Sequence, residues 1–223
     1  MEIIVALDSQ DRNHLNFILK ELEMFKPFYK VGLELFYTYP NIVEELKSLG
    51  FKVFLDLKLH DIPNTVESAL KTLRRYNPDL INIHTLGGTE MMTRAAAVFH
   101  HTPTKIIGVT QLTSSDKHFM EEVGFKDSIE ESVLRLSKLA KSSGLQGIVC
   151  GALEVPFIKE HLGKDFLTVT PGIRLDQNVQ DQKRVVTPSQ AKKLGSDYIV
   201  VGRPITANEN PRKIYEQIAK DIL

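Results

Sequence analysis

The segment from Phe54 to Asp61 carries the residues best suited to chemistry. It reads Phe-Leu-Asp-Leu-Lys-Leu-His-Asp, and this alternation of apolar and charged residues is typical of a β-strand with Asp56 and Lys58 on one side. A lysine beside a carboxylate keeps its proton, because the opposite charge favours the ammonium form. Such a lysine is a poor Schiff-base nucleophile but a good proton donor.

Two more charged residues follow or lie within the two apolar runs that precede this segment. We expect them to reach the same end of a sheet and to form one alternating array: Asp8, Lys30, Asp56 and Lys58. Such an array favours loss of CO2 from a carboxylate substrate and protonation of the resulting carbanion. The array could accelerate loss of CO2 either by repelling the substrate carboxylate or by stabilising the transition state with preorganised charges. A purely structural ion-pair cluster is the alternative.

Short apolar runs alternate with segments of helical period along the whole chain. Their near-continuous hydrophobicity predicts parallel strands covered on both faces. The eight predicted strands are Ile3–Leu7, Phe28–Gly32, Lys52–Leu57, Leu80–His84, Lys105–Thr110, Gly147–Cys150, Leu167–Thr170 and Tyr198–Val201. With no composition break, they indicate one α/β domain over residues 1–223, a (β/α)8 TIM barrel. A doubly wound open sheet is less favoured, because no Gly-x-Gly-x-x-Gly follows Leu7.

Two helix starts are marked by capping signals. Ser128 and Glu131 form a capping-box pattern before the periodic segment 129–142, and Gly144 lies just past its end. The stretch Thr187–Gln190 repeats the pattern with a proline at the first helical position.

The predicted strands end in polar residues, as a barrel enzyme requires, because barrels place their chemistry at the carboxyl ends of the strands. Phosphate often binds after strands seven and eight. There Gly202 would let the backbone approach closely, and Arg203 offers a bidentate guanidinium. The segment 175–186 is long for a connection of this kind, which is typical of a lid or binding loop, although a solvated surface excursion is the alternative.

The composition excludes several classes of protein. The 223 residues include 28 Lys and Arg and 28 Asp and Glu, a net charge of zero, which argues against a broad nucleic-acid or anionic-membrane surface. The single cysteine, Cys150, cannot form an internal disulfide and is expected to be a small buried hydrophobe. No signal-peptide pattern and no long apolar stretch is present, so we expect a cytoplasmic protein.

Residues 56–66, Asp-Leu-Lys-Leu-His-Asp-Ile-Pro-Asn-Thr-Val, resemble the signature of the orotidine 5'-phosphate decarboxylases. The Asp-x-Lys-x-x-Asp core is shared with a wider superfamily, whereas the Ile-Pro-Asn-Thr-Val extension is much more specific. The resemblance continues in the order of the bacterial-type enzyme through segments 6–8, 30–32, 170–174, 181–184 and 201–205.

The resemblance implies a role for each catalytic position. Lys58 is similar to the proton donor to C6 of the pyrimidine, and Asp56 to the carboxylate set against the substrate carboxylate. Asp8 and Lys30 are similar to the groups that hold the ribose hydroxyls, with Lys30 also bonded to the array. Asp61 is similar to a catalytic residue lent to the neighbouring subunit.

The resemblance also implies a substrate-binding set and a homodimer with shared sites. Thr65 would cross the interface with Asp61, Thr113 would contact the pyrimidine ring, and Gln182, Gly202 and Arg203 would hold the phosphate. The remaining substrate-contacting positions are Ile62, Pro171 and Arg174. The implied substrate is orotidine 5'-phosphate, with no cofactor and no metal.

Other functions fit less well. A sugar-phosphate decarboxylase or synthase of the same superfamily would share Asp-x-Lys-x-x-Asp but use Mg²⁺, and residues 62–65 and Gln182 argue against it. A non-catalytic phosphoribosyl-binding barrel would not need both Asp56 and Lys58. His84, expected to point inward, is either a site residue or a satisfied core histidine.

Overall fold

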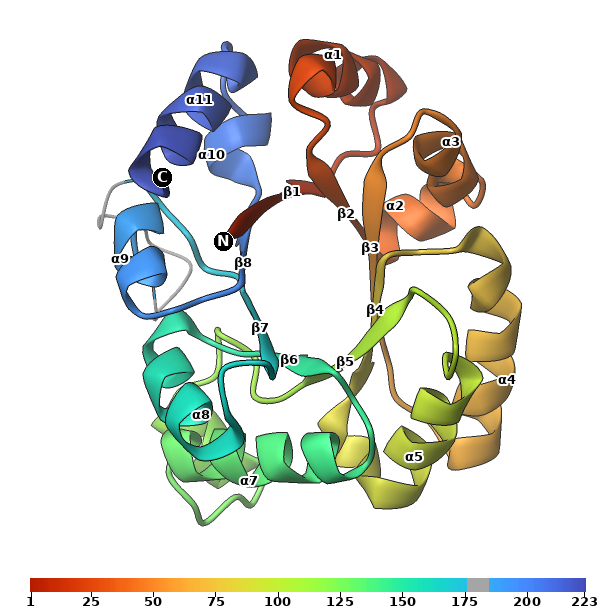
Figure 1. Cartoon of the computed structure of the whole chain (residues 1–223), viewed down its shortest axis with the longest axis vertical. Coiled ribbons are helices and arrows are strands. Elements are labelled where there is room, and N and C mark those ends of the chain that lie inside the picture. Colours follow the sequence, from red (N-terminus) through yellow and green to blue (C-terminus); the bar gives the residue numbers. More distant parts are fainter. Residues whose placement is uncertain (176–184) are drawn as a thin grey trace.

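Eight parallel strands form a closed barrel in which each strand pairs with the next and β8 pairs with β1. Figure 1 shows the computed structural model, with the strands as an inner ring and the helices outside it. The structure describes residues 1–175 and 185–223. The strands are β1 Glu2–Leu7, β2 Phe28–Gly32, β3 Lys52–Leu59, β4 Leu80–His84, β5 Lys105–Val109, β6 Gly147–Val149, β7 Leu167–Thr170 and β8 Tyr198–Val201. The predicted (β/α)8 barrel is confirmed.

Four of the predicted strands have the observed bounds, and the other four differ at one end. Strands β5 and β6 each end one residue before the predicted end. The N–H groups of Thr110 and Cys150 nevertheless donate to the carbonyl oxygens of Val149 and Val169. Strand β1 begins one residue early. Strand β3 runs two residues further than predicted, to Leu59, because its pairing with β4 resumes there after an irregularity.

The connections contain eleven α-helices and four short 3-10 helices in the described part of the chain. The α-helices are α1 Arg12–Leu22, α2 Leu33–Thr38, α3 Ile42–Ser48, α4 Pro63–Leu73, α5 Gly88–Val98, α6 Lys117–Glu122, α7 Ile129–Ser142, α8 Val155–Leu162, α9 Pro188–Lys193, α10 Arg203–Thr206 and α11 Pro211–Asp221. The 3-10 helices are η1 Glu23–Phe25, η2 Arg74–Tyr76, η3 Thr85–Gly87 and η4 Ala152–Glu154.

Both predicted capping boxes are present. The Ser128 hydroxyl accepts the N–H of Glu131, and the Glu131 carboxylate accepts the N–H of Ser128 at the start of α7. Thr187 and Gln190 form the same reciprocal pair at the start of α9. Each box gives partners to backbone donors that the first turn of a helix leaves unpaired.

The alternation of side chains along the strands creates two apolar layers. The barrel interior is filled from seven strands by Ile4, Ala6, Phe28, Phe54, Leu80, Ile107, Val169 and Val200. The larger layer lies between barrel and helices and includes Leu55 and Leu57. Phe54 therefore points into the barrel, while Leu55 and Leu57 point toward the helices, as the alternation predicts. Cys150 belongs to the outer layer and is fully buried, as expected.

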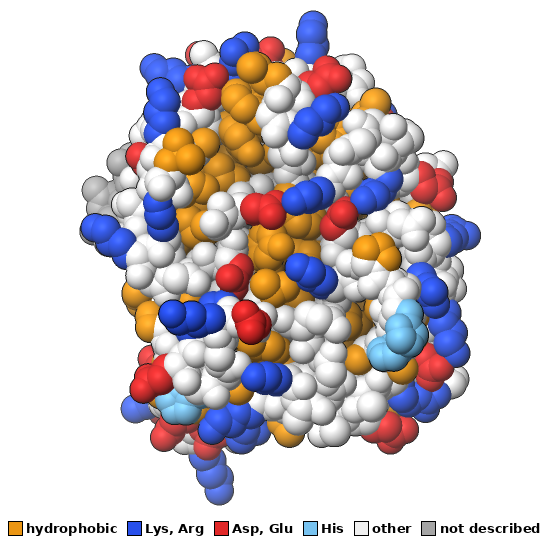
Figure 2. Space-filling view, in the orientation of Figure 1, with side chains coloured by type: hydrophobic (Ala, Val, Ile, Leu, Met, Phe, Trp, Pro, Cys, Tyr) orange, Lys and Arg blue, Asp and Glu red, His pale blue; other side chains and the backbone are white. Residues whose placement is uncertain are grey.

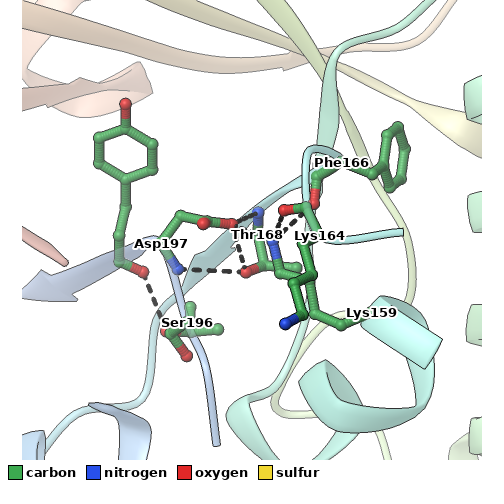
Figure 3. A network of polar contacts seen from close by, with 8 residues as sticks. Lys159, Lys164, Phe166, Thr168, Ser196 and Asp197 are labelled. Atoms are coloured by element: carbon green, nitrogen blue, oxygen red, sulfur yellow. Dashed lines mark hydrogen bonds and ion pairs between the residues drawn. The ribbon is translucent and has the colours of Figure 1, made fainter. Parts of the chain in front are cut away.

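Aspartates at the amino ends of β8 and β4 tie helices to the barrel. Asp197 accepts hydrogen bonds from the ammonium of Lys159 at 2.6 Å and from the N–H and hydroxyl of Thr168 at 2.7 and 2.9 Å (Figure 3). Asp79 likewise accepts hydrogen bonds from the N–H of Val53 and from the ammonium of Lys47 on α3. These contacts stabilise the end of the barrel opposite to the carboxyl ends of the strands, which leaves those ends available for chemistry.

Charged side chains of both signs are interspersed over the face shown in Figure 2, with hydrophobic side chains between them. Among the coloured residues of that face, no broad region of one sign is visible, in keeping with the balanced composition. In the part of the chain that the structure describes, no helix is both long enough and apolar enough to cross a membrane.

Candidate active site

Four charged side chains form one chain of ion pairs at the carboxyl ends of β1, β2 and β3. The ammonium of Lys30 lies 3.0 Å from Asp8 Oδ1 and 3.5 Å from Asp56 Oδ2. The ammonium of Lys58 lies 2.7 Å from Asp56 Oδ1. The structure therefore brings the four residues together in the order Asp8, Lys30, Asp56, Lys58, with alternating sign.

Asp56 is the most buried member of this array, with its side chain only 10% exposed. Burial alone would raise the pKa of Asp56, but the charges of Lys30 and Lys58, with hydrogen bonds from Lys58 and Asn82, lower it below its ordinary value. The carboxylate is therefore ionised at neutral pH. A buried charge of this kind persists only where it is paired and hydrogen-bonded.

Glycine at position 32 makes room for the lysine of this array. The residue is paired with Asp56 across β2 and β3, and a Cβ there would lie 3.0 Å from the ammonium of Lys30 and 3.6 Å from Asp8 Oδ1. Any side chain would push the ammonium away from its two carboxylates. Gly202 is similarly close to Asp8, since a Cβ there would lie 3.6 Å from Asp8 Oδ2.

Three members of the array, Lys30, Asp56 and Lys58, line one side of a cavity of about 280 Å³, whereas Asp8 does not line it. Of the predicted site residues, Lys30, Asp56, Lys58, Thr113 and Pro171 line it. Apolar and neutral side chains form the remaining walls: Phe54, Val109, Gln111, Leu112, Ser114, Val149 and Val200. The cavity thus places a row of charges against an apolar surface, which suits a ligand with one charged edge and one apolar edge.

Two of the predicted phosphate-binding residues, Gly202 and Arg203, directly follow the carboxyl end of β8. Gly202 precedes α10, and the exposed Arg203 is the first residue of that helix. The guanidinium of the half-buried Arg174 donates to the carbonyl oxygen of Ile173 at 2.9 Å. Gln182 and most of the predicted loop 175–186 lie outside the described residues.

The predicted residues that precede or begin α4 do not line the cavity of their own chain. Asp61, Ile62 and Thr65 are exposed around the start of α4, where Pro63 is the first helical residue. The carboxylate of Asp61 accepts the N–H of Ile62 at 2.6 Å. With Ile62 66% exposed, this segment presents a large apolar side chain to the surroundings beside a carboxylate.

Asn82 was missed by the sequence analysis as a site residue. It is fully buried, its amide donates to Asp56 Oδ1 at 2.7 Å, and its Oδ1 accepts the backbone N–H of Lys58 at 2.8 Å. The available signal was an asparagine in the middle of the apolar strand Leu-Ile-Asn-Ile-His. A polar group in such a strand is buried and must find partners.

His84 does not line this cavity. It borders a separate one of about 180 Å³, and its ring lies 5.6 Å from that of His60. Burial lowers the pKa of His84, with further lowering from His60 and Lys58. Its buried Nδ1 has no hydrogen-bond partner among the described residues.

Comparison with known proteins places this geometry in a family. Residues 1–218 match the family described as "Orotidine 5'-phosphate decarboxylase / HUMPS family". The chain belongs to that family. Two curated members are named orotidine 5'-phosphate decarboxylase. The one from Staphylococcus saprophyticus is 49% identical over 99% of this chain and 97% of that protein. The one from Carboxydothermus hydrogenoformans is 50% identical over 94% of this chain and 91% of that protein.

Two solved structures have the same fold as this chain. The crystal structure of orotidine 5'-phosphate decarboxylase from Lactobacillus acidophilus is similar to this chain with a TM-score of 0.87 and 41% identity, covering 99% of this chain and 98% of that one. The structure titled as an uncharacterized conserved protein from Geobacillus kaustophilus has the same TM-score and identity and covers 99% and 100%.

Proposed function

We propose that this protein decarboxylates orotidine 5'-phosphate to UMP and CO2, the last step of de novo pyrimidine nucleotide synthesis, in the cytoplasm and with neither a metal nor an organic cofactor. The observation that carries the proposal is the chain of ion pairs Asp8–Lys30–Asp56–Lys58, of which the last three residues line an otherwise largely apolar cavity. Family membership and the names of relatives that are about half identical support the same reaction.

In the proposed reaction, the substrate carboxylate at C6 of the pyrimidine lies next to Asp56. The bond between C6 and the carboxylate breaks, its electron pair stays on C6, and CO2 leaves. Lys58 donates a proton from Nζ to C6 and becomes neutral until it regains a proton from water. Its fixed positive charge also stabilises the negative charge that develops on C6.

The apolar walls suit the leaving group. A carboxylate becomes a neutral CO2 molecule in this step, and Val109, Val149 and Val200 line the cavity with side chains that cannot hydrogen-bond. Such walls solvate a carboxylate poorly and accept CO2 well. They also exclude water from C6, which strengthens the electrostatic contribution of the array.

Arg203 is proposed to bind the substrate phosphate together with Gly202 and Gln182. For Arg203→Ala we expect the dissociation constant of UMP to rise roughly ten- to a hundredfold, because one charge-assisted hydrogen-bonding group is lost. Uridine, which lacks the phosphate, should bind nearly as before. Titration calorimetry with both ligands measures the difference. Equal weakening of UMP and uridine would contradict the phosphate assignment.

We propose a homodimer in which Asp61 and Thr65 of one subunit complete the site of the other. In support, both residues are exposed and absent from the cavity lining of their own chain. Between them in sequence lies Ile62, a large apolar side chain that is 66% exposed. Exposed apolar surface bordered by charges is typical of an interface between subunits.

A mixture of two inactive variants tests this sharing of sites. Lys58→Ala and Asp61→Ala homodimers should each be nearly inactive on their own. After subunits reassort at random, half of the dimers are mixed, and one of the two sites in each mixed dimer has both residues intact. About a quarter of the wild-type activity should therefore return. Activity no greater than that of the two variants assayed separately would show that Asp61 acts within its own chain.

The function itself is tested by following the absorbance of orotidine 5'-phosphate with purified protein, with and without EDTA. We expect turnover that EDTA does not change. Activity on sugar phosphates that depends on Mg²⁺, with no turnover of orotidine 5'-phosphate, would instead establish the alternative sugar-phosphate reaction. Binding of nucleotides without any turnover would indicate a non-catalytic barrel.

A further inference from the structure

We infer that Asn82 is a positioning residue for the proposed decarboxylation, which holds the proton donor Lys58 and the carboxylate of Asp56 in one fixed geometry. The inference rests on the proposed function for its kinetic consequence.

Strands β3 and β4 are out of register where the array is built. Leu55 is paired with Ile81, and Leu59 with Ile83. Three residues of β3, numbers 56 to 58, therefore lie opposite the single residue Asn82 of β4. An irregularity of this kind bends a strand and re-aims its side chains. Here it leaves backbone groups of β3 without their regular partners on β4.

The side chain of Asn82 supplies the missing partner. Its Oδ1 accepts the backbone N–H of Lys58 at 2.8 Å. Lys58 has a φ of 50°, in the left-handed region, which is strained for a lysine and persists only where the surroundings impose it. Without the bond to Asn82, both this backbone conformation and the direction of the Lys58 side chain would lose their support.

The other end of the same amide orients the carboxylate. The Nδ2 of Asn82 donates to Asp56 Oδ1 at 2.7 Å, the oxygen that also accepts from the ammonium of Lys58. Asp56 Oδ2 has the longer contact with Lys30, at 3.5 Å. One amide therefore fixes Asp56 by its side chain and Lys58 by its backbone. No aliphatic side chain can do either, because both functions need polar atoms of opposite kind.

The expected signature is a loss of turnover with little loss of binding. For Asn82→Ala we expect kcat to fall about a hundredfold, since a displacement of reacting groups by about 1 Å costs that much. The KM for orotidine 5'-phosphate and the dissociation constant of UMP should stay within about threefold, because the contacts to phosphate and ribose remain. A parallel loss of kcat and binding, or a kcat near that of the wild type, would overturn the inference.

Asn82→Asp gives a readout that a merely structural role would not move. A protonated carboxyl has the shape of the amide and can donate to Asp56 while its carbonyl accepts from Lys58. An ionised one would face Asp56 as a second negative charge. The nearby ionisable groups are Asp56 and Lys58 on β3, Lys30 beyond Asp56, and the His60–His84 pair; on β5, the paired residue Ile107 is apolar.

We therefore expect the kcat of Asn82→Asp, relative to the wild type, to recover as the pH is lowered, whereas Asn82→Ala should show no such recovery. Identical relative pH profiles for the two variants would overturn the inference. Thr104→Val is the matched control, because it removes one buried hydrogen bond, to the carbonyl of Pro78, just before β5 begins. It should keep wild-type kcat and pH profile.

A measurement that needs no activity separates this inference from the proposed function. Hydrogen exchange of the Lys58 backbone amide, followed by NMR, should be at least about tenfold faster in Asn82→Ala than in the wild type, because its acceptor is gone. In Thr104→Val it should be unchanged. Unaltered exchange in Asn82→Ala would defeat the positioning role, whereas a wild type that exchanges slowly but does not turn over orotidine 5'-phosphate would defeat the proposed function alone.

Discussion

Lys58→Ala is expected to reduce kcat for orotidine 5'-phosphate roughly 10⁴-fold, the upper range for loss of a general acid. The variant loses the proposed proton donor for C6 and, with it, the positive charge proposed to stabilise the developing carbanion. UMP should still bind, because the residues proposed to hold its phosphate, Gly202 and Arg203, follow β8 and are not altered by a substitution on β3. Stopped assays for turnover and calorimetry for UMP measure the two effects separately.

A matched lysine on the same strand controls for the loss of charge. Lys52 lies at the opposite end of β3, is 55% exposed in its side chain, and pairs with Glu2 at 2.9 Å. Lys52→Ala should keep wild-type turnover, because an exposed ion pair contributes little to stability. Near-wild-type turnover in Lys58→Ala would overturn its assignment as proton donor.

Asp56→Asn is expected to reduce kcat roughly 10³-fold with little change in the fold, because the amide is nearly isosteric with the carboxylate. The variant removes the negative charge that is proposed to face the substrate carboxylate. It also leaves the ammonium groups of Lys30 and Lys58 without the carboxylate that they share at 3.5 and 2.7 Å. Two neighbouring positive charges then repel each other, and Lys58 loses its alignment.

The binding of ligands distinguishes this effect from unfolding. UMP has no carboxylate at C6, so its dissociation constant should change by less than about tenfold in Asp56→Asn. Asp127→Asn is a suitable control, since that carboxylate is exposed and pairs with Arg135 on α7 at 2.8 Å. A kcat within about tenfold of the wild type would show that Asp56 does not take part in the chemical step.

The local parts of the fold could be predicted from the sequence because their causes are local. The capping boxes of α7 and α9 depend on residues three positions apart, and both are present. The inward side of Phe54 and the outward side of Leu55 follow from the alternation of a strand. Closure into a barrel followed from counting eight such strands with helical segments between them.

The sequence by itself determined the eight strands, the alternation that points Asp56 inward, and the motif that indicates the family. Only the tertiary structure decided that Asn82 contacts both Asp56 and Lys58, and that Lys58 takes a left-handed backbone. The reason is that the register between β3 and β4 depends on packing and hydrogen bonds between residues about 26 apart in the chain. No periodicity within either strand specifies that register, so the geometry of the proton donor appears only when the barrel closes.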